Sequence, residues 1–203
     1  MESLKDWKIG IMTTGKKIFN IVLKAIIILI IFYILFYMLL LNSCSKTKRY
    51  NDITKFEELT NEVYGANYQI PSVDELGQYE SIALFYNETK QIFWVIDSLT
   101  LKVTYNAVEF EKALNNIDLK YSFLKETKEY LLDYYAIIDG YEIQVVNKNE
   151  KMQDDYSYNY PKCFLMIGIN KKEQTIVFLY HYDSDVDCIK DLDNFINKYY
   201  ILE

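Results

Sequence analysis

Histidine, cysteine, proline and glycine are all scarce in this chain of 203 residues, which holds one, three, two and six of them respectively. With a single histidine, His181, the chain cannot build a zinc site from two or three imidazoles, and any serine–histidine triad would depend on that one residue. The sequence has no C-x-x-C pair, no phosphate-binding or dinucleotide-binding glycine motif and no G-x-S-x-G elbow. These absences favour a protein that is not an enzyme, and we expect no cofactor.

Charge is divided unevenly along the chain. Residues 1–49 carry eight basic and two acidic side chains, a balance of +6, which leaves 22 − 8 = 14 basic and 29 − 2 = 27 acidic side chains for the rest, a balance of −13. Nucleic-acid binding needs Lys and Arg to neutralise phosphates, so we expect no nucleic acid as a partner. An acidic domain is also repelled by an anionic lipid surface, and we expect it to stand away from the membrane.

An apolar run precedes the acidic part. Residues 25–41 hold no charge or amide, and extension back to residue 18 makes the helix long enough to cross a hydrocarbon core of about 30 Å. More basic residues precede the run than follow it, which places the N-terminus in the cytoplasm. The prediction is a cytoplasmic N-terminus (1–17), a transmembrane helix or signal segment (18–41), a polar tether (42–51) and an extracytoplasmic domain (52–203).

The end of this run holds the residues Leu41, Asn42, Ser43 and Cys44. They resemble the lipobox of bacterial lipoproteins, which has an aliphatic residue three positions before a cysteine and a small residue directly before it. The resemblance implies that the Cys44 thiol receives a diacylglycerol and that the chain is cut before it, and it implies nothing about the domain. The alternative is an uncleaved single-pass anchor, favoured by the long N-terminal region and long apolar run. Both alternatives place the domain outside a bacterial cell membrane.

Three amphipathic helices are predicted in the domain. Residues 51–65 show an apolar stripe at helical spacing, with Thr54 and Glu57 at the spacing of a capping box and Gly65 at the end of the helix. Asn106 is expected to cap a second helix, which carries apolar residues on one side as far as residue 117. A third helix closes the chain, with Asp185 as its N-cap.

Strands are predicted between and around these helices. Residues 81–86 and 91–97 are rich in strand-forming residues and are joined by four polar residues, a pattern typical of a hairpin. The dipeptide Asp139-Gly140 predicts a tight turn between two further strands. The remaining strands are predicted over 101–105, 119–125 and, as a last hairpin, 163–182. We predict the α+β class, with one mainly antiparallel sheet and helices covering one face.

The sequence offers one candidate metal site. Asp183, Asp185 and Asp187 alternate after His181, as carboxylates do in calcium-binding loops, but the sixth position is Cys188 where such loops have glycine. The structural alternative is that these aspartates cap the last helix at its positive end. His181 is then a strand residue that faces its neighbours.

Two further groups of residues have a functional and a structural interpretation. In an extended segment Tyr156, Tyr158 and Tyr160 would present three rings on one side as a ligand surface, or else pack as an edge strand. Cys163 and Cys188 would form a disulfide outside the cell, or else stay as two thiols.

The sequence therefore predicts a membrane-anchored extracytoplasmic module that binds an unknown protein or small molecule. One alternative is an envelope hydrolase or metal-binding protein that uses the aspartates at 183–187. Another is a single-pass accessory subunit whose helix docks on a membrane complex. Asn87, Glu88 and Thr89 also fit a glycosylation acceptor, which matters only in a eukaryotic secretory pathway.

Overall fold

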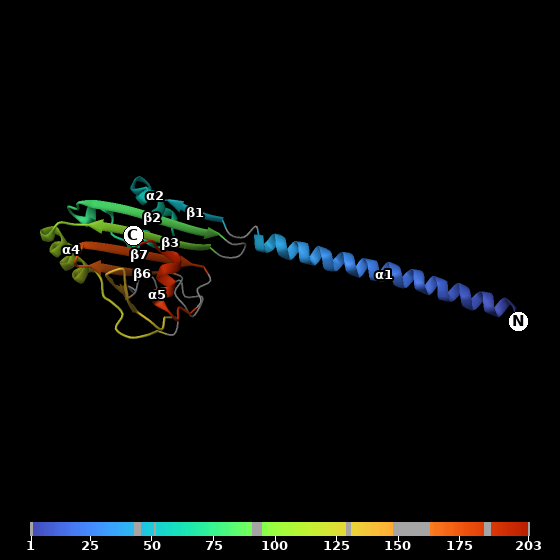
Figure 1. Cartoon of the computed structure of the whole chain (residues 1–203). Helices are drawn as coiled ribbons and strands as arrows, with labels where there is room; N and C mark the ends of the chain where they lie inside the picture. Colours follow the sequence, from blue (N-terminus) through green and yellow to red (C-terminus); the bar gives the residue numbers. More distant parts are fainter. Residues whose placement is uncertain are drawn as a thin grey trace. The chain divides into compact units, whose positions relative to one another are not determined.

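The computed structural model describes residues 2–42, 46–50, 52–90, 95–128, 131–147, 163–184 and 188–202. They divide into two compact units, Met1–Ser45 and Lys46–Glu203. The first unit is the helix α1 (Glu2–Asn42), drawn in blue in Figure 1. Its segment Ile18–Met38 is long and apolar enough to span a membrane, and its side chains are exposed. The predicted N-terminal apolar helix is confirmed.

The second unit is a single antiparallel sheet with helices, which confirms the predicted α+β class (Figure 1). The described residues form seven strands: β1 (Lys46–Tyr50), β2 (Ser81–Lys90), β3 (Val95–Thr104), β4 (Tyr135–Ile138), β5 (Tyr141–Val145), β6 (Cys163–Asn170) and β7 (Thr175–Asp183). Their order across the sheet is β1-β2-β3-β7-β6-β5-β4. The helices are η1 (Ile53–Lys55), α2 (Phe56–Glu62), α3 (Ala66–Gln69), η2 (Val73–Leu76), α4 (Ala107–Lys120) and α5 (Leu192–Tyr199).

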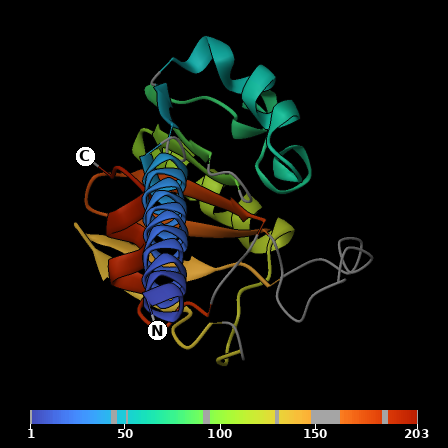
Figure 2. The ribbon, with the colours of Figure 1, turned by 90° about the vertical axis from the view of Figure 1, so that its right-hand side faces the viewer.

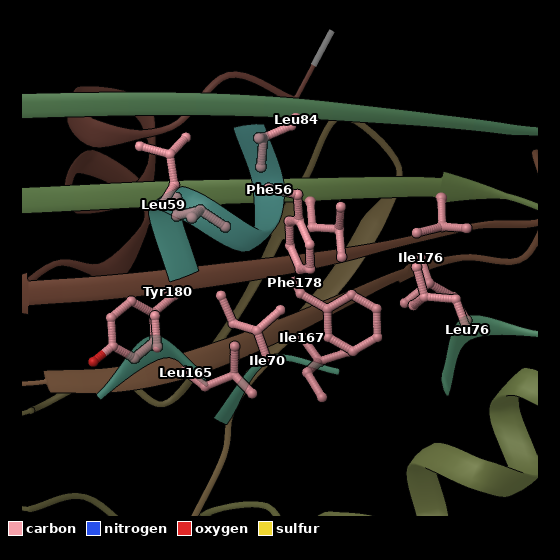
Figure 3. Packing of buried hydrophobic residues seen from close by; sticks show 14 of the residues in the cluster. Phe56, Leu59, Ile70, Leu76, Leu84, Leu165, Ile167, Ile176, Phe178 and Tyr180 are labelled. Carbon is pink, nitrogen blue, oxygen red and sulfur yellow. The ribbon is translucent and has the colours of Figure 1, made fainter. Parts of the chain in front are cut away.

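Helices cover both faces of the sheet, so the expectation of a single covered face is wrong. On one face α2, α3, η2 and α4 pack on the central strands, and Figure 3 shows Phe56 and Leu59 of α2 near Leu84 of β2. On the other face Leu192 and Ile196 of α5 pack against β6 and β7. Figure 2 shows α2 and α5 on either side of the central strands. The reason is that β6 and β7 are almost continuously apolar, so that they present apolar side chains on both faces of the sheet. Both faces must then be shielded from water by other elements.

The hairpin between β4 and β5 has the predicted tight turn. Asp139 and Gly140 have φ angles of 51° and 81°, the left-handed conformations of a type I′ turn.

Gly168 of β6 lies in a crowded part of the sheet, where there is no room for a side chain. A Cβ atom at residue 168 would lie 2.6 Å from Cγ2 of Val177 and 2.9 Å from Cγ1 of Ile143. Glycine is therefore needed here for close side-chain packing.

The long hairpin of β2 and β3 corrects two strand predictions. The polar residues 87–90 are not the turn, because β2 continues through them to Lys90. They stay in the strand because β1 pairs with them on one side and β3 on the other. The predicted third strand, 101–105, is the second half of β3 rather than a separate element. Residues 46–50, expected as tether, form β1 and belong to the sheet.

Of the three predicted N-cap residues, one is confirmed, and the other two helices are capped by different residues. Asn106 caps α4, and its Oδ1 accepts hydrogen bonds from the amides of residues 108 and 109 at 3.1 and 3.0 Å. The first helical segment is capped by Asp52 instead of Thr54. The last is capped by Asp191, while the predicted cap, Asp185, lies outside the described residues. Residues 119–125 continue α4 to residue 120 and then form one isolated bridge rather than a strand.

Candidate functional site

A pocket lies on the face of the sheet that α5 covers, here called the α5 face. Strand β3 presents polar side chains on this face. Ser98 and Thr100 of β3 alternate with Leu99 and Leu101, which belong to the core of the opposite face, so their side chains point to the α5 face. The pocket has a volume of about 420 Å³. Strands β2 and β3 and the end of α5 line it with the residues Phe85, Tyr86, Asn87, Ser98, Thr100, Asn197, Lys198, Tyr199, Tyr200 and Ile201.

Three buried polar atoms of these lining residues have no hydrogen-bond partner within the described part of the chain. They are Oδ1 of Asn87, Oγ of Ser98 and the hydroxyl oxygen of Tyr200. Ser98 is 2% exposed and Tyr200 7% exposed. Leaving such a group unpaired costs roughly 1–3 kcal/mol. A ligand that offered hydrogen-bond partners to these side chains, once they shifted toward it, would recover this cost.

The segment after α5 crosses the sheet and forms one wall of the pocket. The Lys102 ammonium of β3 donates a hydrogen bond to the Leu202 carbonyl at 2.9 Å, which holds this segment over β3. In Figure 1 the end of the chain lies in front of β2 and β3. Among the described residues that line the pocket, Lys198 is the one charged residue, and its ammonium lies 4.7 Å from the centre of the Tyr199 ring.

His181 lies beside this pocket in an aromatic cluster. It is opposite Ser98 in the pairing of β7 with β3, and its ring centre lies 4.7 Å from that of Phe195 and 5.1 Å from that of Tyr199. Burial, and secondarily the charge of Lys198, lowers the pKa of His181 to about 3. Its imidazole is therefore neutral near pH 7 and too weakly basic to be a general base. The geometry agrees with the interpretation of His181 as a strand residue that faces its neighbours.

A second pocket, of about 300 Å³, lies on the opposite face between η2 and α4. Its lining is mainly apolar and includes Leu76, Ile117 and Phe178. The ammonium of Lys120 lies 3.0 Å from a carboxylate oxygen of Glu75. None of the described residues that line this pocket carries a buried polar atom without a partner. The two pockets therefore differ in chemistry, and the second supplies control positions for experiments on the first.

An acidic group is buried on the same face as the second pocket. The Tyr86 hydroxyl donates a hydrogen bond to Oδ1 of Asp97 at 2.7 Å, and Lys90 and Glu88 form an ion pair at 2.7 Å. Burial raises the pKa of Asp97; the Tyr86 hydrogen bond opposes this change and the charge of Glu88 adds to it. Neither Asp97 nor Glu88 lines either of the two pockets. We interpret the group as a polar part of the core.

The structure places only some of the residues that the sequence singled out. Asp183 ends β7, whereas Asp185 and Asp187 lie outside the described residues, so the metal site stays a prediction. Within the described ranges no three His, Cys, Asp or Glu side chains are grouped so as to hold a metal ion. Cys44 and the residues at 156, 158 and 160 also lie outside the described part.

The two cysteines of the predicted disulfide lie in different surroundings. Cys163 is buried at the start of β6, where the side-chain amide of Gln69 donates a hydrogen bond to its sulfur at 3.6 Å. Cys188 is half-buried shortly before α5. Their pairing outside the cell stays a prediction.

Sequence reasoning missed the residues that line the pocket. In the sequence Asn87 belongs to a predicted turn and fits a glycosylation acceptor, whereas Ser98, Thr100 and Tyr200 form no motif. One signal was present: polar residues at alternate positions of a strand whose other positions are apolar. That pattern also fits an ordinary solvent-facing strand, so it could not identify a pocket.

A comparison of the chain with protein-family models, curated proteins and solved structures finds no match. Function therefore has to be inferred from the chemistry of the pocket.

Proposed function

We propose that this chain is a membrane-anchored binding module of a bacterial envelope and that its domain takes a small ligand in the pocket between β2, β3 and α5. The domain lies on the extracytoplasmic side. The observation that carries the proposal is the set of three buried, unpaired polar atoms from Asn87, Ser98 and Tyr200 in the pocket wall. Folded proteins leave few such atoms unpaired, and each exception calls for a specific explanation, such as a functional role.

The size and position of the pocket support a role in binding. Its volume of about 420 Å³ falls within the range of about 300–1,000 Å³ that small-molecule sites occupy. Aromatic side chains and a few placed polar groups line it, as they line most such sites. The weak basicity of His181 is a reason to prefer binding over hydrolysis at this position.

The test uses the full-length chain in detergent micelles and a chemically diverse library of small molecules, screened by saturation-transfer NMR. Asn197 is exposed at the pocket wall, so Asn197→Trp should occlude the pocket without disturbing the core. The matched control is Asn116→Trp, because Asn116 is also exposed and lines the second pocket.

We expect library members that bind the wild type and the Asn116→Trp variant but not the Asn197→Trp variant. Binding that is equal in all three proteins, or absent from the wild type, would overturn the proposal. The side of the membrane is tested separately by adding protease to spheroplasts. Removal of the domain is expected, whereas protection of the domain until the membrane is opened would place it in the cytoplasm.

A further inference from the structure

The pocket on the α5 face is lined by side chains that mostly carry no charge. Asn87, Ser98, Thr100 and Asn197 contribute amides and hydroxyls, each of which both donates and accepts hydrogen bonds. Lys198 is the one cation, and no Asp or Glu is found among the lining residues that the structure describes. The ligand should therefore be rich in groups that also both donate and accept, which hydroxyl groups do.

Charge excludes several other ligand classes. A cationic ligand, or the ammonium group of a zwitterionic amino acid, would be repelled by Lys198, and the described lining offers no anion to offset this repulsion. An anionic ligand would have Lys198 in its favour, but it would approach a part of the chain with a net charge of −13 (14 − 27) after residue 49. A purely apolar ligand would leave the atoms of Asn87, Ser98 and Tyr200 unpaired.

Aromatic rings supply the remaining part of the recognition. Phe85 comes from β2, whereas Tyr199 is the last residue of α5 and Tyr200 follows it. A flat aromatic ring offers an apolar face that can cover aliphatic C–H groups, while a tyrosine hydroxyl offers hydrogen bonding. A sugar ring has both kinds of surface, with C–H groups on its faces and hydroxyls around its edge.

We infer that the pocket binds a neutral saccharide, with its hydroxyl groups paired to Asn87, Ser98 and Tyr200 and its ring faces covered by the aromatic side chains. This inference rests on the proposed function and adds the class of ligand. The pocket volume of about 420 Å³ lies at the lower end of the usual range for small-molecule sites, which fits one or two sugar rings better than a long chain.

The test measures thermal unfolding of the full-length chain by tryptophan fluorescence. The detergent is octaethylene glycol monododecyl ether, because a maltoside or glucoside headgroup would itself compete for the pocket. The probes are glucose, galactose, mannose, N-acetylglucosamine and maltose, with adenosine, uridine, glycine and glutamate as non-saccharide probes. At tenfold excess over the dissociation constant, a bound saccharide should raise the unfolding midpoint by about 3–6 °C.

Ser98→Ala is the decisive variant because it should change two quantities in opposite directions. Without ligand its midpoint should rise by about 2–4 °C, since a buried hydroxyl without a partner is removed. Its affinity for the saccharide should fall about tenfold, so that the midpoint shift at the same concentration drops to about a third. Asn116→Ala, at the second pocket, should keep the full shift. A purely structural role for Ser98 would leave the saccharide shift unchanged.

The outcomes separate the two proposals. A saccharide shift that is reduced in Ser98→Ala and kept in Asn116→Ala supports the inference. A shift with a nucleoside or amino acid alone, or no saccharide shift while the library still yields ligands sensitive to Asn197→Trp, overturns the saccharide class and leaves the binding pocket standing. No shift in the panel together with no such library ligand overturns both.

Discussion

His181 is expected to make the domain less stable as the pH falls from 7.5 to 5. In the folded state its pKa is lowered to about 3 because the side chain is buried against the rings of α5, with the charge of Lys198 nearby. In the unfolded chain its pKa should be near the reference value of about 6.5. Between these two values only the unfolded state binds the proton, so acid favours unfolding.

The size of this effect follows from the two pKa values. Stability is fully retained above pH 6.5 and is lost by about 1.4 kcal/mol per pH unit below it, until the pH reaches the folded pKa of about 3. From pH 7.5 to pH 5 the loss is about 2 kcal/mol. The raised pKa of Asp97 acts with the opposite sign, because the folded state then binds a proton more readily than the unfolded state and gains stability in acid. Comparison with a variant at residue 181 cancels the contribution of Asp97.

The assay is urea unfolding of the full-length chain in non-ionic micelles at several pH values, for the wild type and for His181→Phe. Phenylalanine has a ring that fits the aromatic cluster, and it removes the buried Nδ1 atom that lacks a partner among the described residues. We expect the difference in unfolding free energy between the two proteins to change by about 2 kcal/mol between pH 7.5 and 5.

A direct measurement keeps this prediction testable if the variant folds poorly. The chain has one histidine, so labelled histidine gives a single imidazole signal in NMR spectra. That signal should not titrate between pH 8 and pH 5 in the folded protein. Titration near pH 6.5, or a pH-independent difference between wild type and His181→Phe, would refute the burial argument.

Three further changes have defined outcomes. Gly168→Ala should lower the unfolding free energy by about 1–3 kcal/mol, because the new Cβ would lie 2.6 Å from Val177; unchanged urea unfolding would contradict this packing. Asn106→Ala should cost about 1 kcal/mol through loss of the α4 cap, whereas Asn116→Ala on the exposed side of the same helix should change stability by less than about 0.5 kcal/mol. Mass spectrometry of the mature chain should find a lipid-modified N-terminus at Cys44 that is lost in Cys44→Ala; the full-length mass in both proteins would instead identify an uncleaved anchor.

Much of the fold could be predicted from local patterns. The turn at Asp139-Gly140 and the cap at Asn106 are confirmed because each depends on the conformation or hydrogen bonding of a few neighbouring residues. The sequence predicts the long strand β2 too short, because its polar end is held by pairing with β1, a partner distant in sequence. Local propensity cannot report such a partner.

The candidate site was not predictable in the same way. Asn87, Ser98 and Tyr200 are 11 and 102 positions apart along the chain. They line one pocket because β2 pairs with β3 and because the segment after α5 returns over β3. No spacing rule connects residues that only strand pairing and helix packing bring together.

The sequence by itself determined the apolar N-terminal helix, the α+β class and the shortage of catalytic and metal-binding residue types, because composition and short-range periodicity suffice for these. The tertiary structure decided that both faces of the sheet are covered, that His181 is buried and neutral, and that polar atoms of β2, β3 and α5 gather in one pocket. Burial and the absence of a hydrogen-bond partner are properties of a side chain's surroundings, and those surroundings are assembled only when distant segments pack.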